Sequence, residues 1–112
     1  MALRELLEDH DYQVLEAGDG VEALTLFHEH QEDVGLVLTD VTLPGRSGLD
    51  LAQEIRELSS DIAVIYASGL GPDDNPPLKV ALSEHNTDFI AKPLELDAVM
   101  KKVEVMLTVS TE

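Results

Sequence analysis

The 112-residue sequence contains no cysteine and no long apolar run. The lack of cysteine excludes a disulfide framework and metal sites built from thiolates, and it fits a reducing compartment. No apolar stretch approaches the ~18 residues that a membrane-spanning helix needs. The first residues also lack the basic start and apolar core of a signal peptide. We therefore expect a soluble, cytoplasmic protein.

Positive charge is also scarce. Seven lysine and arginine residues stand against 23 aspartate and glutamate residues, which gives a formal net charge of -16. Nucleic acids and anionic membranes repel such a chain, so neither is expected as a direct partner. A basic patch on another protein, or a divalent cation, is the more natural counterpart. The length suits one domain spanning residues 1–112, and a hydrophobic fraction of 44% is ordinary for a globular fold.

The most informative stretch runs from Val34 to Thr39 and stops at Asp40. Its apolar residues do not alternate with polar ones, which is typical of a strand covered on both faces in a parallel sheet. Proline and glycine in the following segment, Thr42–Gly48, predict a loop. Asp40 therefore lies at the C-terminal end of a strand, where open α/β sheets carry their chemistry.

Helical and extended patterns alternate along the rest of the chain. Asp19 and Glu22 have the spacing of a capping box, and Ser47 and Asn75 are N-caps of two further helices. The expected helices span 2–10, 21–30, 48–58, 76–84 and 95–109, and the expected strands span 12–17, 34–39, 62–67 and 87–91. Strands that alternate with helices predict an α/β fold with a parallel sheet.

Three of these strands are followed directly by a residue that can take part in chemistry: Asp40, Ser68 and Lys92. The C-terminal ends of parallel strands lie along one edge of a sheet, so these side chains can converge. A carboxylate can act as a nucleophile and form an acyl phosphate. A hydroxyl and an ammonium can bind the oxygens of the transferred phosphoryl group. The set therefore suits phosphoryl transfer.

The chain resembles the receiver domain of two-component response regulators. The resemblance rests on the segments 36–48, Ala67-Ser68-Gly69 and Ala91-Lys92-Pro93, and on the helix entry at residues 18–24. It implies a flavodoxin-like (CheY-like) three-layer α/β sandwich. It also implies a signalling protein rather than a conventional enzyme, one that at most catalyses its own phosphorylation and dephosphorylation. A histidine kinase or a histidine phosphotransfer protein would be the partner.

The same resemblance assigns roles to single residues. Asp40 would accept the phosphoryl group from a phosphohistidine, with Mg²⁺ beside it, and the backbone carbonyl of Thr42 would be a metal ligand. Ser68 would move to the phosphate, Lys92 would be its cationic partner, and Phe89 would turn inward as the hydroxyl moves. The bond between Lys92 and Pro93 is typically cis in this family.

One departure from the family pattern is large. The family's first strand and the acidic pair that follows it have no counterpart in residues 1–112. One carboxylate and one carbonyl should bind Mg²⁺ weakly or not at all. In the strand order 2-1-3-4-5, the missing strand would lie between strands 12–17 and 34–39. Either this gap closes within the chain, or another chain fills it in a homo-oligomer or a strand-swapped dimer. We favour association between chains.

Two functions remain open from the sequence. The set of Asp40, Ser68 and Lys92 favours a phosphorylated receiver, and the missing acidic pair favours a receiver-like module that only mediates protein contacts. A phosphatase of the haloacid type would need a second aspartate two residues after Asp40, where this chain has Thr42. A stand-alone regulator and a receiver from a hybrid kinase cannot be distinguished by these residues.

Overall fold

The computed structural model describes residues 2–43 and 46–110. Its helices are α1 (Ala2–Asp9), α2 (Gly20–Glu29), α3 (Gly48–Leu58), α4 (Pro76–Ala81) and α5 (Leu96–Ser110), with a 3-10 turn η1 (Pro72–Asp74). Its strands are β1 (Leu36–Asp40), β2 (Thr42–Leu43), β3 (Arg46–Ser47), β4 (Ala63–Ser68) and β5 (Thr87–Ala91). Strands β1, β4 and β5 form a parallel sheet in that order, which confirms the predicted architecture.

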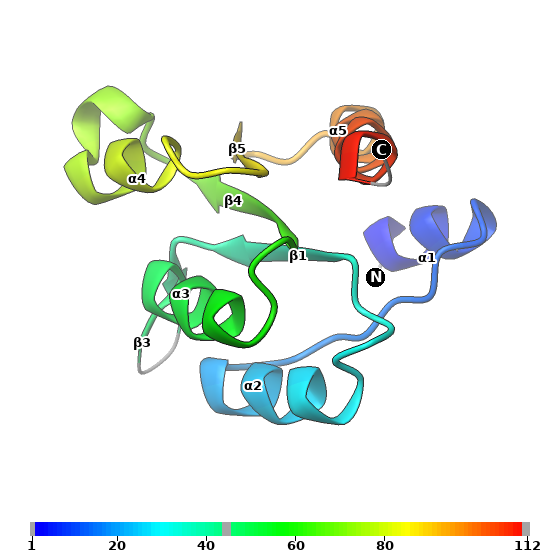
Figure 1. The fold of residues 1–112 in the computed structure, drawn as a ribbon. Helices are drawn as coiled ribbons and strands as arrows, with labels where there is room; N and C mark the ends of the chain where they lie inside the picture. Colours follow the sequence, from blue (N-terminus) through cyan, green and yellow to red (C-terminus); the bar gives the residue numbers. More distant parts are fainter. Residues whose placement is uncertain (1, 44–45, 111–112) are drawn as a thin grey trace.

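The sheet lies between two layers of helices (Figure 1). The central strand β4 is buried along its whole length, because helices cover both of its faces. Residues of α1 and α5 pack with one set of its side chains: Leu3, Ala63, Ile65, Ala67, Val99, Val103 and Met106. Residues of α2, α3 and α4 pack with the alternate set: Phe27, Leu51, Ile55, Val64, Tyr66 and Leu78.

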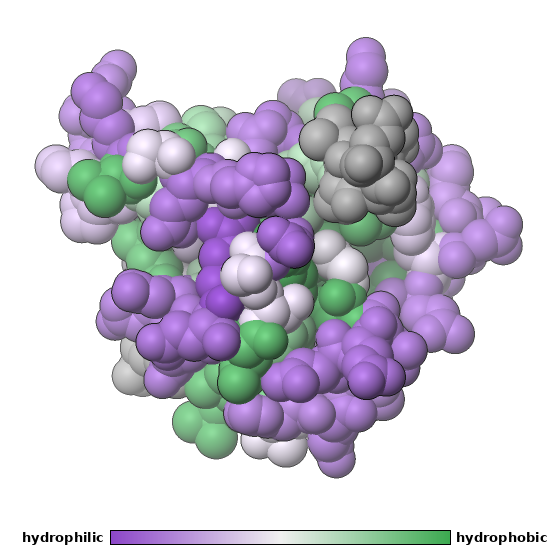
Figure 2. Space-filling model, in the orientation of Figure 1, coloured by the Kyte–Doolittle hydropathy of each residue, from purple (hydrophilic) through white to green (hydrophobic). Residues whose placement is uncertain are grey.

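The face of the molecule in Figure 2 is mostly hydrophilic around its rim, with hydrophobic residues gathered in the middle. Within the described parts of the chain, no helix combines the length and the apolar character that crossing a membrane requires.

Three predicted helix starts are confirmed by their caps. The Asp19 carboxylate accepts a hydrogen bond from the Glu22 amide at 2.8 Å, and Glu22 accepts one from the Gly18 amide at 2.8 Å. The Ser47 hydroxyl accepts from the Leu49 amide at 3.0 Å. The contacts to the Glu22 and Leu49 amides satisfy donors that the first helical turn leaves without a partner. Asn75 caps α4 in the same way, with Pro76 in its first turn.

The predicted strand at Tyr12–Ala17 is wrong. This segment joins α1 to α2 and belongs to neither of the two sheets. Its only described backbone hydrogen bond runs from the Tyr12 amide to the carbonyl of Leu7. An ion pair of 2.9 Å between Arg4 and Glu16 ties it to α1. Its alternating pattern suits a strand, but a strand also needs a neighbour, and no described strand lies beside it.

Smaller corrections concern element ends. The predicted loop Thr42–Gly48 contains a short antiparallel pair, β2 with β3, in which Thr42 lies opposite Ser47. The predicted loop 69–75 contains η1, and the helix expected to reach residue 84 ends at Ala81. The other elements differ from expectation by two residues or fewer at their ends, which is the usual uncertainty of helix and strand limits.

Candidate functional site

Three neighbouring strands end at the same edge of the sheet, as the sequence predicted. Asp40 is the last residue of β1, Ser68 is the last residue of β4, and Lys92 directly follows β5. In the register, Asp40 lies opposite Ala67, and Ser68 lies opposite Ala91. The Lys92 amide also donates to the Ser68 carbonyl at 2.9 Å, so the backbone of Lys92 is held beside the end of β4.

Asp40 and Lys92 are in direct contact. The Lys92 Nζ lies 3.0 Å from the Asp40 Oδ1, and both side chains are nearly half exposed, at 44% and 43%. Their strands lie on opposite sides of β4, about 10 Å apart by the usual strand spacing. The lysine side chain therefore extends across the end of the central strand to reach the carboxylate. Because the pair is open to solvent, an incoming reactant can reach the carboxylate.

Ser68 occupies the end of β4 between these two residues, but its hydroxyl is bonded elsewhere. Ser68 is 7% exposed. Its Oγ donates to the Leu70 carbonyl at 2.8 Å and accepts from the Leu70 amide at 3.1 Å. The hydroxyl is thus engaged with the loop that follows β4. The structure brings Ser68 to the predicted edge, but its hydroxyl makes no hydrogen bond to Asp40 or Lys92.

The remaining predicted site residues lie near this edge. Thr42, whose carbonyl was expected to bind a metal, follows Asp40 by two residues and exposes its side chain. Phe89 lies opposite Tyr66 in the sheet and packs, half-buried, against the cluster formed with α3 and α4. The Lys92–Pro93 peptide bond is cis, as the family resemblance implies.

Two neighbours of Asp40 were not given roles by the sequence. The buried Thr39 hydroxyl donates to the Asp40 carbonyl at 3.0 Å. Gly48, at the start of α3, lies against the same peptide group, and its amide donates to the Val41 carbonyl at 2.7 Å. The only available signal for Gly48 was its place in the motif after Asp40, since a contact across a loop leaves no local pattern.

The described residues do not fit a magnesium site on their own. Receiver domains generally bind Mg²⁺ in a pocket of acidic side chains. Within residues 2–43 and 46–110, no three histidine, cysteine, aspartate or glutamate side chains are grouped so that they could hold a metal ion. Asp40 contributes a single carboxylate, and Lys92 already occupies one of its oxygens. Mg²⁺ normally requires six oxygen ligands in octahedral geometry, several of them water.

The amino-acid sequence is similar to those of known receiver domains. Residues 1–104 match the family described as the response regulator receiver domain. The chemotaxis protein CheY of Halobacterium salinarum is 31% identical over 106 residues, which cover 95% of this chain and 85% of that protein. An uncharacterized response regulatory protein of Staphylococcus epidermidis is 33% identical over 96 residues. The match spans 83% of this chain but only 36% of that longer protein.

Solved structures agree with the sequence matches. A response regulator receiver domain protein from Clostridium thermocellum has a TM-score of 0.84 and 26% identity, and the match covers 98% of this chain and 86% of that one. The receiver domain of the hybrid histidine kinase CckA has a TM-score of 0.78 and 28% identity, with 95% and 86% covered. The flavodoxin-like fold expected from the sequence is thereby confirmed, and the chain belongs to the response regulator receiver domain family.

Proposed function

We propose that residues 1–112 form one receiver domain in which Asp40 accepts a phosphoryl group from a phosphohistidine. The donor would be a histidine kinase or a histidine phosphotransfer protein. The observation that carries the proposal is the contact of 3.0 Å between Asp40 and Lys92, beside Ser68, at the C-terminal edge of a parallel sheet. A nucleophile and a cation at this edge are the two groups that phosphoryl transfer needs most.

The proposed step is an in-line displacement. A carboxylate oxygen of Asp40 attacks the phosphorus, the bond between phosphorus and the histidine nitrogen breaks, and the electron pair stays on the imidazole. The imidazole takes up a proton from water, so the products are an acyl phosphate on Asp40 and a neutral histidine on the donor. Lys92 stabilises the negative charge on the phosphoryl oxygens, since its ammonium already lies at the attacking carboxylate.

The signal would begin at Ser68. A phosphorylated Asp40 carries nearly two negative charges and strong acceptor oxygens. To donate to them, the Ser68 hydroxyl must give up its two contacts with Leu70, which frees the loop after β4. The half-buried ring of Phe89 could then turn inward, so the face made by α4, β5 and α5 would change. Binding of Mg²⁺ to this chain would be weak, because the carboxylate set is incomplete.

The experiment is phosphorylation of the folded chain by a small phosphodonor such as acetyl phosphate, with and without Mg²⁺, read by intact mass. The native chain should gain one phosphoryl group, and Asp40→Asn should gain none. Lys92→Met should react far more slowly, because the cation is lost. Asp97→Asn, an exposed aspartate on α5, is the matched control and should react as the native chain does.

A receiver-like module that only binds other proteins is the second candidate. The single carboxylate at the site favours it. If the folded native chain takes up no phosphoryl group from acetyl phosphate or from a phosphorylated histidine phosphotransfer protein, this second function replaces the first. Uptake by Asp40→Asn at the native level would instead show that another residue is the acceptor.

A further inference from the structure

Helices α3 and α4 border an open groove of about 460 Å³ on the side of the sheet away from α5. Leu49 of α3 and Pro77 and Val80 of α4 form its apolar walls, and Tyr66 of β4 lies at its base. Val80 is 71% exposed, so its side chain is open to a partner. The volume is in the range of sites that accept a drug-sized molecule or a few side chains of a partner.

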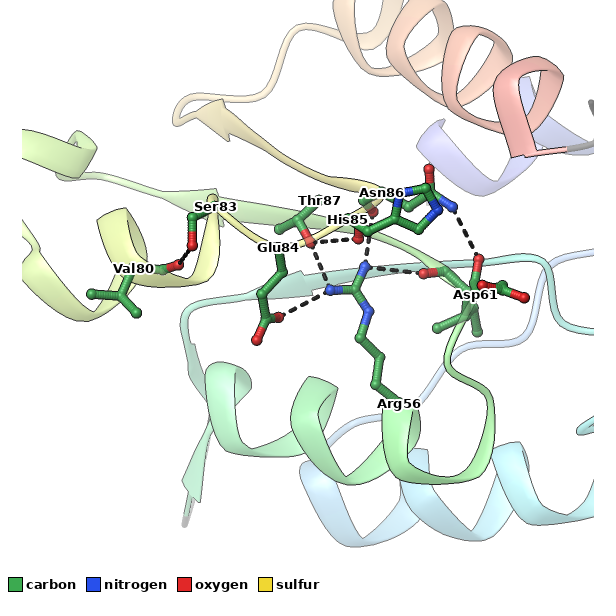
Figure 3. A network of polar contacts seen from close by, with 9 residues as sticks. Arg56, Asp61, Val80, Ser83, Glu84, His85, Asn86 and Thr87 are labelled. Carbon is green, nitrogen blue, oxygen red and sulfur yellow. Dashed lines mark hydrogen bonds and ion pairs between the residues drawn. The ribbon is translucent and has the colours of Figure 1, made fainter.

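The rim of the groove is acidic. Asp50 of α3 and Glu84, which follows α4, both line it, and both side chains are exposed. Glu84 Oε2 accepts from Arg56 at 3.0 Å, as Figure 3 shows. No described bond reaches its other carboxylate oxygen. Arg56 has its remaining contacts inside the protein, with Thr87 and two backbone carbonyls. The rim therefore keeps acceptor oxygens for a second cation.

The base of the groove contains the hydroxyl of Tyr66, which is not among the buried side-chain atoms that lack a partner in the described residues. Tyr66 is only 2% exposed, and no hydrogen bond of its hydroxyl occurs within the described residues. The ring of Tyr66 is therefore buried while its oxygen opens to the groove, and a hydroxyl in that position can donate to a bound group. Burial raises the pKa of this hydroxyl, although Arg56 opposes the shift, and it therefore keeps its proton at neutral pH.

We propose that this groove between α3 and α4 binds a basic amphipathic segment of a partner protein. An apolar side chain of the segment would lie between Leu49 and Val80, a lysine or arginine would pair with Asp50 and Glu84, and a carbonyl would accept from Tyr66. This is the pattern by which amphipathic helices dock in grooves. Binding in the groove does not require phosphorylation, since none of these residues belongs to the site at Asp40.

Charge decides between the candidate occupants. The chain has only seven lysine and arginine residues against 23 acidic ones, so a second copy of it is a poor source of the required cation. A nucleic acid would place phosphates against the carboxylates of the rim. A basic protein segment matches both the sign of the rim and the apolar walls.

The test is a titration of the ¹⁵N-labelled chain with three synthetic peptides. The first has leucine at helical spacing with lysines between, the second is its scramble of equal composition, and the third has glutamate in place of lysine. Only the first should shift the amide resonances of groove residues such as Leu49 and Val80 in a saturable way. Val80→Glu and Asp50→Lys should weaken binding about tenfold, the size of effect that one lost interface contact commonly has.

Matched controls lie on α5, at Val105, which is 55% exposed, and at Asp97. Val105→Glu and Asp97→Lys make the same changes away from the groove and should leave binding unchanged. Equal binding of the scrambled peptide, equal weakening by the α5 variants, or shifts spread over all acidic faces would overturn the proposal. So would light scattering that finds a dimer which Val80→Glu dissociates, because a second copy would then occupy the groove.

Discussion

The Cα of Gly48 lies so close to the backbone of Asp40 that a side chain at position 48 would overlap with the Asp40 carbonyl oxygen. A Cβ there would also come within 2.9 Å of the carbonyl carbon of Asp40 and 3.1 Å of the Thr39 Oγ1. Backbone atoms cannot move aside as the end of a flexible side chain can. Glycine at this position therefore allows α3 to begin directly against the strand that carries the proposed phosphoacceptor.

We expect Gly48→Ala to lower the free energy of unfolding by about 1–3 kcal/mol, the usual cost of overpacking. Alanine normally stabilises a helix by about 0.5–1 kcal/mol relative to glycine. A net loss of stability in Gly48→Ala would therefore show that the added Cβ collides with the Asp40 backbone. Urea unfolding followed by circular dichroism measures the change. Gly18→Ala is the control, because no atom lies within 4 Å of its Cβ position. Equal stability of Gly48→Ala and the native chain would contradict the argument.

The sequence predicted the site better than its surroundings. The positions of Asp40, Ser68 and Lys92 followed from buried apolar runs that end in a polar residue, which is a local pattern. The bonds of Ser68 to Leu70 and the collision at Gly48 depend on how a loop and a helix return to the sheet. No spacing rule carries that information. The error at Tyr12–Ala17 has the same origin, because a strand depends on a neighbour as well as on its own residues.

Arg56 is the clearest example of a contact that local patterns miss. Its guanidinium donates to the Thr87 hydroxyl at 2.7 Å and to the carbonyls of Ile62 and Asn86 at 3.0 and 2.9 Å. Figure 3 shows the guanidinium among Glu84, Asn86 and Thr87. Arg56 also donates to Glu84. Its side chain is 12% exposed. These contacts connect α3 to the start of β4 and to the segment between α4 and β5, so they hold three elements in register.

We expect Arg56→Met to cost about 1.5–3 kcal/mol of unfolding free energy, the range for hydrogen bonds that involve a charged group. Arg56→Lys should recover only part of this loss, since one ammonium cannot reproduce the planar fork of a guanidinium. Chemical denaturation of the three proteins measures both effects. Arg4→Met removes two exposed ion pairs, with Glu8 and Glu16, and should change stability much less. A loss at Arg4 as large as that at Arg56 would show that burial does not govern these contacts.

Tyr66 should make the protein sensitive to alkaline pH. Burial raises the pKa of its hydroxyl above the ordinary value of 10.0, an effect that Arg56 opposes and Glu84 reinforces. A folded-state pKa above that of the unfolded chain means that the folded protein keeps this proton longer. Tyr66 therefore contributes its full stability below pH 10.0, and the contribution is lost as pH rises from there through the folded-state pKa.

The measurement is a pH series of urea unfolding, together with the phenolate absorbance of the folded protein. The native chain should lose stability above pH 10.0 faster than Tyr66→Phe does, because the variant has no hydroxyl to ionise at this position. The absorbance that develops latest in the native titration should be missing from the variant, which keeps Tyr12 as its other tyrosine. Identical pH profiles for the two proteins would contradict the assignment.

Among the described residues, strand β1 has a partner strand on one edge only. The Ala63 amide donates to the Gly35 carbonyl, and the Val41 amide donates to the Ala67 carbonyl. Backbone groups alternate along a parallel strand, so residues 35, 37, 39 and 41 face β4. The amides and carbonyls of Leu36 and Leu38 therefore point to the other edge, beside which no described strand lies. Both residues are half-buried, and an unsatisfied buried backbone group costs about 1–3 kcal/mol.

Several such groups would consume much of the ~5–15 kcal/mol that stabilises a typical domain. Because the Tyr12–Ala17 segment does not close onto β1, we expect the 112-residue chain to pair this edge with a strand of another copy. Light scattering at low micromolar concentration should then report a mass above that of the monomer. The assembly should grow with added salt, since screening weakens the repulsion between two chains of charge -16.

Hydrogen exchange makes this last expectation specific to β1. In the associated protein, the amides of Leu36 and Leu38 should be as strongly protected from hydrogen exchange as the Val37 amide, which already faces β4. Dilution to the monomer should release the first two and leave Val37 protected, because only the outer edge loses its partner. A cooperatively unfolding monomer that protects all three amides would mean that the gap closes within one chain. A stable assembly in which Leu36 and Leu38 still exchange freely would mean that the copies meet at another surface.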